Sequence, residues 1–195
     1  VGTNGTVKAI GHLDLDKMGV RLILGNAYHL YLRPGPEVIE KAGGLHAFST
    51  WPHNILTDSG GYQVFSLAQF RKVSSEGVRF RSHIDGSYHD FTPEKVINLQ
   101  RILGSDVCMP LDVCTPPGIS QKEAEEALTI TMDWLHRSKY AWLESREEWE
   151  GSLFGIVQGN FFDVRRLRAA EETAALDIPG IAIGGLSVGE DWDAF

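Results

Sequence analysis

Apolar and polar positions along the chain alternate in blocks that are typical of alternating strands and helices. Short apolar runs that end in Gly or a polar side chain predict strands, and these runs occupy residues 21–26, 54–57, 106–112, 153–159 and 181–186. Segments with helical spacing and capping residues predict helices at 12–18, 37–42, 93–103, 120–143 and 164–176. Residues 1–8, which alternate with glycines, are interpreted as the end of a strand. Because strands that alternate with helices pair in parallel, the pattern predicts an α/β fold built on a parallel sheet.

The segment from about residue 73 to residue 91 departs from this pattern. Residues 78–84 alternate apolar and polar, and Asp85-Gly86 follows directly, which is a strong signal for a β-hairpin. We interpret this segment as a hairpin insertion in an otherwise alternating strand–helix chain. The 195 residues suffice for one domain with a sizeable core, and we predict a single domain over 1–195.

Each predicted strand leads into a group that is able to bind a ligand. These groups are Asn26, Asp58, Asp112, Gln158 and the pair Gly184-Gly185. In a parallel barrel the loops that follow the strands share one face, and that face holds the active site. Taken alone, the Asp58 segment is equally compatible with an ordinary helix cap. Five such strand ends in succession favour a shared site.

The chemistry of these groups suits a flat heterocycle with donors and acceptors on its edge. Asp112 is able to accept two N–H bonds from a guanine-like edge, while Gln158 and the Gly185 N–H are able to donate hydrogen bonds to a carbonyl oxygen of the ligand. The glycines after Asp58 let backbone approach a ligand, and Tyr62 is placed to cover a ring. A sugar or phosphate site would instead require Arg or Lys at the strand ends, and the sequence has none there.

Composition narrows the protein class. The chain is 43% hydrophobic and 23% charged, and no apolar run reaches the length of a membrane span. Two cysteines, Cys108 and Cys114, do not form a disulfide framework, so we expect a reducing cytoplasm. The net charge of −8 argues against a broad nucleic-acid surface. The first residue is Val rather than Met, and we expect the chain to be a piece of something longer.

Several motifs together resemble the tRNA-guanine transglycosylase family. They are the segments 24–30 (LGNAYHL), 58–66 (DSGGYQVFS), 81–86 (RSHIDG), 157–159 (VQG) and 182–190 (AIGGLSVGE). The resemblance runs the length of the chain. It implies a TIM-type (β/α)8 barrel that exchanges guanine at the wobble position of certain tRNAs for a 7-deazaguanine base. Bacterial members use the aminomethyl precursor of queuine, 7-aminomethyl-7-deazaguanine (preQ1).

The resemblance also implies roles for individual residues. Asp58 matches the active-site proton acceptor, and Asp112 and Gln158 match the residues that read the purine edge. Leu186 matches the position whose carbonyl meets the aminomethyl group. The remaining base-binding positions are Ser59, Gly60, Gly61, Tyr62, Gly184 and Gly185, and the supporting pocket positions are Asn26, Cys114, Val188 and Glu190. Cys114 and Val188 follow the bacterial pattern, which favours the smaller precursor base.

Two positions depart from the family. Val113 stands where the family usually has Glu, and Asn160 stands where it usually has Gly. The resemblance further implies that the covalent nucleophile, a second aspartate, lies beyond residue 195, together with the last barrel strands, a basic tRNA-binding surface and a zinc subdomain with three Cys ligands and one His ligand. We therefore expect an incomplete barrel that binds no metal itself and is inactive alone. For the complete member we expect zinc, a homodimer, and tRNA substrates with G34 in a U-G-U anticodon loop.

Two other functions are compatible with parts of the pattern. A non-catalytic partner subunit of a transglycosylase would bind a base or tRNA without reacting, but such subunits lose pocket residues that this chain keeps. An unrelated barrel lyase or aldolase would require a lysine or metal ligands at the strand ends. We interpret His29 and His83 as packing or hydrogen-bonding groups. Either histidine could form a metal site together with Cys108 and Cys114, but the spacing of the two cysteines is not that of a zinc site.

Overall fold

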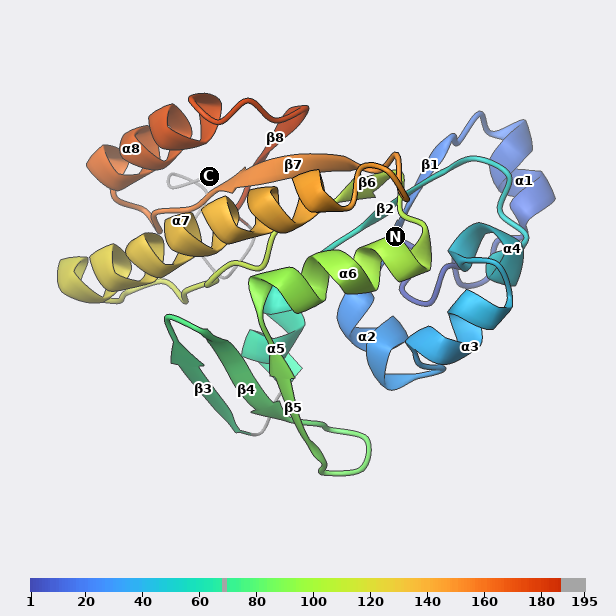
Figure 1. Cartoon of the computed structure of the whole chain (residues 1–195), viewed down its shortest axis with the longest axis horizontal. Helices are drawn as coiled ribbons and strands as arrows, with labels where there is room; N and C mark the ends of the chain where they lie inside the picture. Colours follow the sequence, from blue (N-terminus) through green and yellow to red (C-terminus); the bar gives the residue numbers. More distant parts are fainter. Residues whose placement is uncertain (68–69, 187–195) are drawn as a thin grey trace.

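The computed structural model of the chain describes residues 1–67 and 70–186. Its centre is a five-stranded parallel sheet of β1 (Leu22–Gly25), β2 (Asn54–Thr57), β6 (Val107–Cys108), β7 (Ser152–Val157) and β8 (Gly180–Ile183). The strands lie in the order β1-β2-β6-β7-β8, and every neighbouring pair is parallel (Figure 1). This order follows the chain without the reversal of a doubly wound sheet. The sheet is therefore a partial TIM-type barrel, which confirms the predicted fold class.

Helices follow the strands, and two of them begin at caps that their sequences favour. They are α1 (His12–Lys17), α2 (Ala27–Leu32), α3 (Pro36–Lys41), α4 (Leu45–Ser49), α5 (Gly61–Leu67), α6 (Pro93–Leu103), α7 (Gln121–Glu144) and α8 (Asp163–Ala174). The Thr92 side chain accepts a bond from the Lys95 N–H at the start of α6. Ser120 and Glu123, three residues apart in the chain, form a capping box at the start of α7. Because α7 packs on α6, α8 and β7, the sheet is covered on its outer side.

The inserted segment is a three-stranded antiparallel sheet rather than one hairpin. Its strands are β3 (Arg71–Ser74), β4 (Gly77–Arg81) and β5 (Tyr88–Phe91), at the bottom of Figure 1. The loop between β4 and β5 spans residues 82–87, so Asp85-Gly86 is part of a longer connection and not a two-residue turn. The carbonyl oxygen of Ser75, in the β3–β4 turn, accepts bonds from Trp134 and Arg137 of α7. These bonds hold the insertion against the barrel.

Two sequence-based predictions of strands are wrong in part. Residues 1–8 form turns, although the Gly2 N–H bonds the Leu24 carbonyl beside β1. The strand predicted over 106–112 is reduced to Val107–Cys108. Beyond this strand, the buried side chain of Gln100 accepts a bond from the Met109 N–H (2.9 Å) and donates one to the Met109 carbonyl oxygen (2.8 Å). These two bonds take the place of the bonds that a neighbouring strand would make. The chain is thereby free to turn before Asp112.

The core lies between the parallel sheet and its helices. Its largest fully buried side chains include Tyr28, Trp51, Phe80, Phe91 and Trp134. Phe80 and Phe91 come from the inner face of the inserted sheet, which is thus packed into the same core as α2. Among residues 1–67 and 70–186, no helix is long and apolar enough to cross a membrane.

Candidate functional site

A cavity of about 340 Å³ lies at the carboxyl ends of the strands. Eleven predicted site residues line it, namely Asp58, Ser59, Gly60, Gly61, Tyr62, Asp112, Cys114, Gln158, Gly184, Gly185 and Leu186. Asn26 lies behind the wall, in contact with Asp58. Val188 and Glu190 lie outside the described residues. Gln63, Met109 and Ile156 also line the cavity and were not predicted.

Asp58 is held by three neutral donors where β2 ends. Its Oδ1 accepts bonds from the N–H groups of Ala27 (2.9 Å) and Gly60 (3.1 Å), and its Oδ2 accepts one from Asn26 Nδ2 (2.5 Å). Asn26 is the N-cap of α2, since its Oδ1 accepts the His29 N–H at 3.1 Å. One asparagine therefore caps a helix and fixes the carboxylate at the same time. Gly60, with φ of +77°, is required here because a Cβ atom would lie 2.9 Å from Tyr28 Cβ.

The charge of Asp58 is poorly stabilised in spite of these bonds. Burial and, to a smaller extent, the nearby Asp112 carboxylate raise the pKa of its carboxyl, the three donors lower it, and the net result is a pKa of about 7. A carboxyl with a pKa near 7 exchanges a proton readily at neutral pH. The position of Asp58 thus fits a proton acceptor.

Asp112 lies across the cavity and is also bound by neutral groups. Its Oδ1 accepts a bond from Ser59 Oγ at 3.1 Å, and its Oδ2 accepts one from Gln158 Nε2 at 2.7 Å. Burial raises the pKa of Asp112, and the bonds from Gln158 and Ser59 oppose this rise. Each oxygen retains a lone pair for a further N–H donor. One amide proton of Gln158 is used on Asp112, which leaves its second proton for another acceptor.

The glycines around the cavity permit close packing on Asp112 and Gln158. A Cβ atom added at Gly61 would lie 2.8 Å from Asp112 Oδ1. One added at Gly184 would lie 2.8 Å from Gln158 Nε2, and one at Gly185 would lie 2.8 Å from Gln158 Oε1. The Gly184 carbonyl accepts a bond from Arg166 Nη1 at 3.1 Å, so an arginine that was not predicted braces this turn.

Tyr62 and Cys114 form two different parts of the cavity wall. Tyr62 is 47% exposed, so its ring is available to cover a ligand. Cys114 is buried, and burial together with the Asp112 charge raises the pKa of its thiol to about 12. The thiol therefore stays neutral and serves as a small apolar wall rather than as a nucleophile.

Asn160 and Val113, the two departures from the family pattern, both make defined contacts in the structure. Asn160 has φ of +54°, a left-handed conformation that suits Gly or Asn. Its Nδ2 donates to Thr115 Oγ1 (3.0 Å) and to the Pro116 carbonyl (2.9 Å), which ties the loop after β7 to the loop after Asp112. Val113 packs against the main core through its side chain, and its N–H bonds Thr131.

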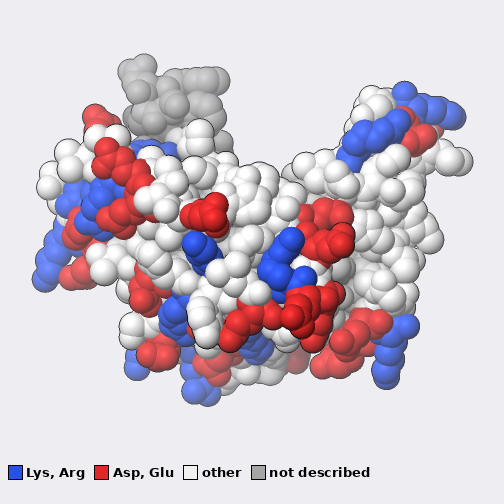
Figure 2. Space-filling model, turned by 45° about the horizontal axis from the view of Figure 1, so that its top comes forward, with Lys and Arg blue, Asp and Glu red and all other residues white. Residues whose placement is uncertain are grey.

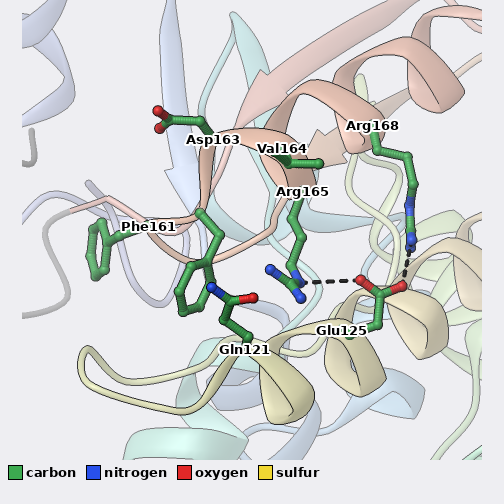
Figure 3. Close-up of a pocket in the computed structure, with 8 residues that line it drawn as sticks. Gln121, Glu125, Phe161, Asp163, Val164, Arg165 and Arg168 are labelled. Atoms are coloured by element: carbon green, nitrogen blue, oxygen red, sulfur yellow. Dashed lines mark hydrogen bonds and ion pairs between the residues drawn. The ribbon is translucent and has the colours of Figure 1, made fainter.

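A larger cavity of about 480 Å³ lies near the N-terminal ends of α7 and α8 (Figure 3). Its charged lining residues are Glu125, Asp163, Arg165 and Arg168, two of each sign. Glu125 pairs with Arg165 at 3.1 Å and bonds Arg168 through its other oxygen. The carboxylate here is neutralised by its own neighbours, in contrast to Asp58 and Asp112.

The predicted histidines take part in packing. Tyr28 Oη and His83 Nδ1 are 2.8 Å apart, and the two rings stack. The His29 ring meets the His83 ring edge-on, and burial lowers the pKa of His29. Within residues 1–67 and 70–186, no three His, Cys, Asp or Glu side chains are grouped to hold a metal ion. The zinc that the resemblance implies has no ligand set in this part of the chain.

Comparison with known proteins gives a consistent result. A family model described as queuine tRNA-ribosyltransferase matches residues 1–195. The chain is 54% identical over 195 residues to a queuine tRNA-ribosyltransferase of Borrelia duttonii, covering 100% of this chain and 52% of the relative. It is 53% identical to those of Treponema denticola and Aquifex aeolicus, over 100% and 97% of this chain and 52% of each relative. The chain spans about half the length of the curated relatives it matches.

Proposed function

The chain belongs to the queuine tRNA-ribosyltransferase family, and from this premise we propose that the whole protein is a pentosyl transferase that exchanges guanine at position 34 of tRNA for a 7-deazaguanine base. The base is preQ1, and the reaction is part of queuosine biosynthesis. Residues 1–195 then make up one incomplete barrel domain with an insertion. The observation that carries this proposal is the pair of carboxylates, Asp58 and Asp112, held only by neutral groups in one cavity at the strand ends.

Asp112 and Gln158 read the edge of the base. The two oxygens of Asp112 accept bonds from the N1–H and the exocyclic amine of guanine. The second amide proton of Gln158 and the Gly185 N–H donate to the carbonyl oxygen of the base. The geometry supports this assignment because Ser59 and Gln158 fix the plane of the Asp112 carboxylate from both sides. The Tyr62 ring covers the face of the base, as the exposure of this ring allows.

Asp58 moves one proton in the exchange. An aspartate of the whole protein, outside this chain, attacks C1′ of nucleotide 34, so that a C1′–O bond forms as the C1′–N9 bond to guanine breaks, and N9 of the departing guanine takes a proton from solvent. The incoming base gives its N9 proton to Asp58, which later returns it to solvent, and N9 attacks C1′ and displaces the aspartate. Two displacements at the same carbon restore its original configuration. The pKa of about 7 at Asp58 supports this role, because the carboxyl both gains and loses a proton near neutral pH.

The finer specificity belongs to the same proposal. Leu186 presents its carbonyl to the aminomethyl group of preQ1, with Glu190 supporting that peptide, while Cys114 and Val188 keep the pocket small. A base inside this cavity has left the stack of the anticodon loop, as base-modifying enzymes require. We further propose a cytoplasmic homodimer that acts on tRNAs with G34 in a U-G-U loop and carries zinc on residues outside this chain.

The test is incorporation of labelled guanine into tRNA by the natural gene product. We expect label in a tRNA with G34 and none in the same tRNA with A34. Competition by unlabelled preQ1 should suppress the label. Binding of guanine without any incorporation would refute the enzyme and support a non-catalytic partner subunit. Incorporation at a position other than 34 would refute the substrate assignment.

A further inference from the structure

The outer face of the inserted sheet carries cations and aromatic rings in two rows. Phe70, Arg81 and Tyr88 lie side by side across the three strands, because the Arg81 N–H bonds the Phe70 carbonyl and Arg81 pairs with Tyr88. Lys72, Arg79 and Asp90 form the next row. We call Phe70, Lys72, Arg79, Arg81 and Tyr88 the cationic sheet face. The opposite face is apolar and buried through Val78, Phe80 and Phe91.

The cations of this face are exposed, and no carboxylate of the described part of the chain pairs with them. Within the described residues, Lys72, Arg79 and Arg81 form no ion pair, whereas Arg137 pairs with Glu94, and Arg165 and Arg168 pair with Glu125. The two rows contain three cations and one carboxylate, in a chain whose net charge is −8. On the face of the molecule shown in Figure 2, by contrast, Lys and Arg lie interspersed with Asp and Glu.

The aromatic rings lie among these cations. Phe70 is 48% and Tyr88 is 55% exposed, and the two rings meet edge-on at 6.0 Å. The Arg79 guanidinium lies over the Tyr88 ring, 5.4 Å from its centre. Exposed rings between unpaired cations are the composition of surfaces that bind single-stranded nucleic acid, where bases stack on rings and cations meet phosphates.

The inserted sheet borders the wall of the cavity through its inner face, on the other side of the strands from the cationic sheet face. Arg71, Val73 and Val78, on the inner face of β3 and β4, line a small hollow together with Gly61, Asp112 and Cys114. Gly61, Asp112 and Cys114 also line the cavity at the strand ends. The Arg71 guanidinium lies over the Phe65 ring of α5, 4.1 Å from its centre, which fixes β3 to the helix that follows Asp58. A nucleic-acid strand whose base occupies the cavity therefore leaves it beside this sheet.

We propose that the cationic sheet face binds the RNA backbone and an unstacked base next to the nucleotide whose base occupies the cavity. Lys72, Arg79 and Arg81 contact phosphates, and Phe70 and Tyr88 stack on the neighbouring base. The inference rests on the proposed function, because it takes the RNA to be the anticodon loop of the tRNA substrate. It places RNA contacts in the part of the chain that precedes Asp112.

The experiment uses the natural gene product with Lys72→Gln, Arg79→Gln and Arg81→Gln combined. We expect the KM for tRNA to rise roughly 10- to 100-fold at about 0.1 M salt, with kcat and the affinity for free guanine unchanged. The slope of log affinity for tRNA against log salt concentration should become shallower by about 2 to 3, because each lost phosphate contact removes about 0.7 to 0.9. The double variant Phe70→Ala with Tyr88→Ala should raise the KM about fivefold or more without changing that slope.

The matched control is Lys17→Gln, Lys41→Gln and Lys122→Gln, which removes the same charge from exposed positions elsewhere. It should leave the KM within about twofold of the parent protein. An equal effect of both triple variants, or an unchanged salt slope in the first, would overturn the inference while guanine exchange by the parent still supports the proposed function. A parent protein that exchanges no guanine would overturn both.

Discussion

Two cavities in the described part of the chain, the one at the strand ends and the one beside α7 and α8, differ in what surrounds their carboxylates. In the larger one, Glu125 lies between Arg165 and Arg168, and its charge is neutralised within the protein. In the smaller one, Asp58 and Asp112 are bound only by amide, hydroxyl and backbone N–H groups. Burial raises the pKa of both aspartates, whereas the two arginines lower the pKa of Glu125.

This contrast explains why the larger cavity is not the candidate ligand-binding site. A carboxylate that is already paired with two cations has little to gain from a neutral ligand. A carboxylate held by neutral donors in a cavity of about 340 Å³ gains two strong bonds when a ligand brings N–H groups to it. We therefore expect the smaller cavity to bind the ligand, whereas the ion pairs of Glu125 in the larger one join α7 to α8.

The largest expected effect comes from Asp112. In the natural gene product, Asp112→Asn replaces an acceptor with a donor opposite the N–H edge of the base, so guanine exchange and guanine affinity should both fall about 100-fold or more. The matched change in the larger cavity, Glu125→Gln, should leave both unchanged and lower the melting temperature slightly. Labelled guanine incorporation and calorimetric titration measure the two quantities. Equal losses in the two variants would remove the distinction between the cavities.

The next effect separates binding from proton transfer. Asp58→Asn should lower guanine exchange about 100-fold and change guanine affinity much less, because Asp58 moves a proton rather than reading the base edge. In the parent protein the group must be deprotonated to accept a proton. The rate should therefore rise about tenfold per pH unit below about pH 7 and level off above it. A profile that is flat from pH 5 to pH 8 would contradict the assignment of Asp58 as the proton acceptor.

A smaller effect comes from adding one methyl group to the wall of the smaller cavity. Gly61→Ala places a Cβ atom 2.8 Å from Asp112 Oδ1 and 2.9 Å from its carbonyl oxygen, so the carboxylate has to move. We expect guanine affinity to fall about tenfold, since the hydrogen bonds to the base become misaligned. The control Val164→Ala removes methyl groups from the exposed wall of the larger cavity and should have no effect on affinity. Similar affinities for both variants would show that Asp112 need not be held in place.

The smallest effect is expected at Asn160. This residue is bonded to the loop after Asp112, and its neighbour in sequence, Phe161, lines the larger cavity. Asn160→Gly keeps the left-handed backbone but loses the bonds to Thr115 and Pro116. The free energy of unfolding should fall by about 1 kcal/mol, with guanine exchange within about twofold of the parent. Denaturant titration measures the first quantity. A larger loss of exchange than of stability would mean that Asn160 positions the active site.

Much of the fold could be predicted because its signals are local. The parallel strands are apolar runs with polar ends, and α7 carries its capping box in four consecutive residues. Strand β3 was missed because all four of its residues are exposed, which leaves no alternation of apolar and polar positions. Helices α2, α4 and α5 were missed because they have only five to seven residues, too few to show a helical period, whereas the equally short α3 is signalled by Pro36 at its start.

The candidate site was predictable for the residues that stand at strand ends and less so for the groups that orient them. Asp58, Asp112 and Gln158 are each signalled by the apolar run before them. The bond from Asn26 to Asp58 joins residues 32 positions apart. Gln100 of α6 bonds the backbone of Met109 and so ends β6 at Cys108. Arg166 braces the carbonyl oxygen of Gly184, a backbone atom that carries no sequence signal. These contacts depend on the folded geometry and not on any pattern along the chain.

The most direct test of the central claim is a crystal structure of the natural gene product with guanine bound. The account predicts the base in the cavity between Asp58 and Asp112, with both Asp112 oxygens within hydrogen-bonding distance of its N1 and exocyclic amine and the Tyr62 ring over its face. Guanine bound instead beside Glu125 and Arg165, or bound at the strand ends with its amine turned away from Asp112, would contradict it.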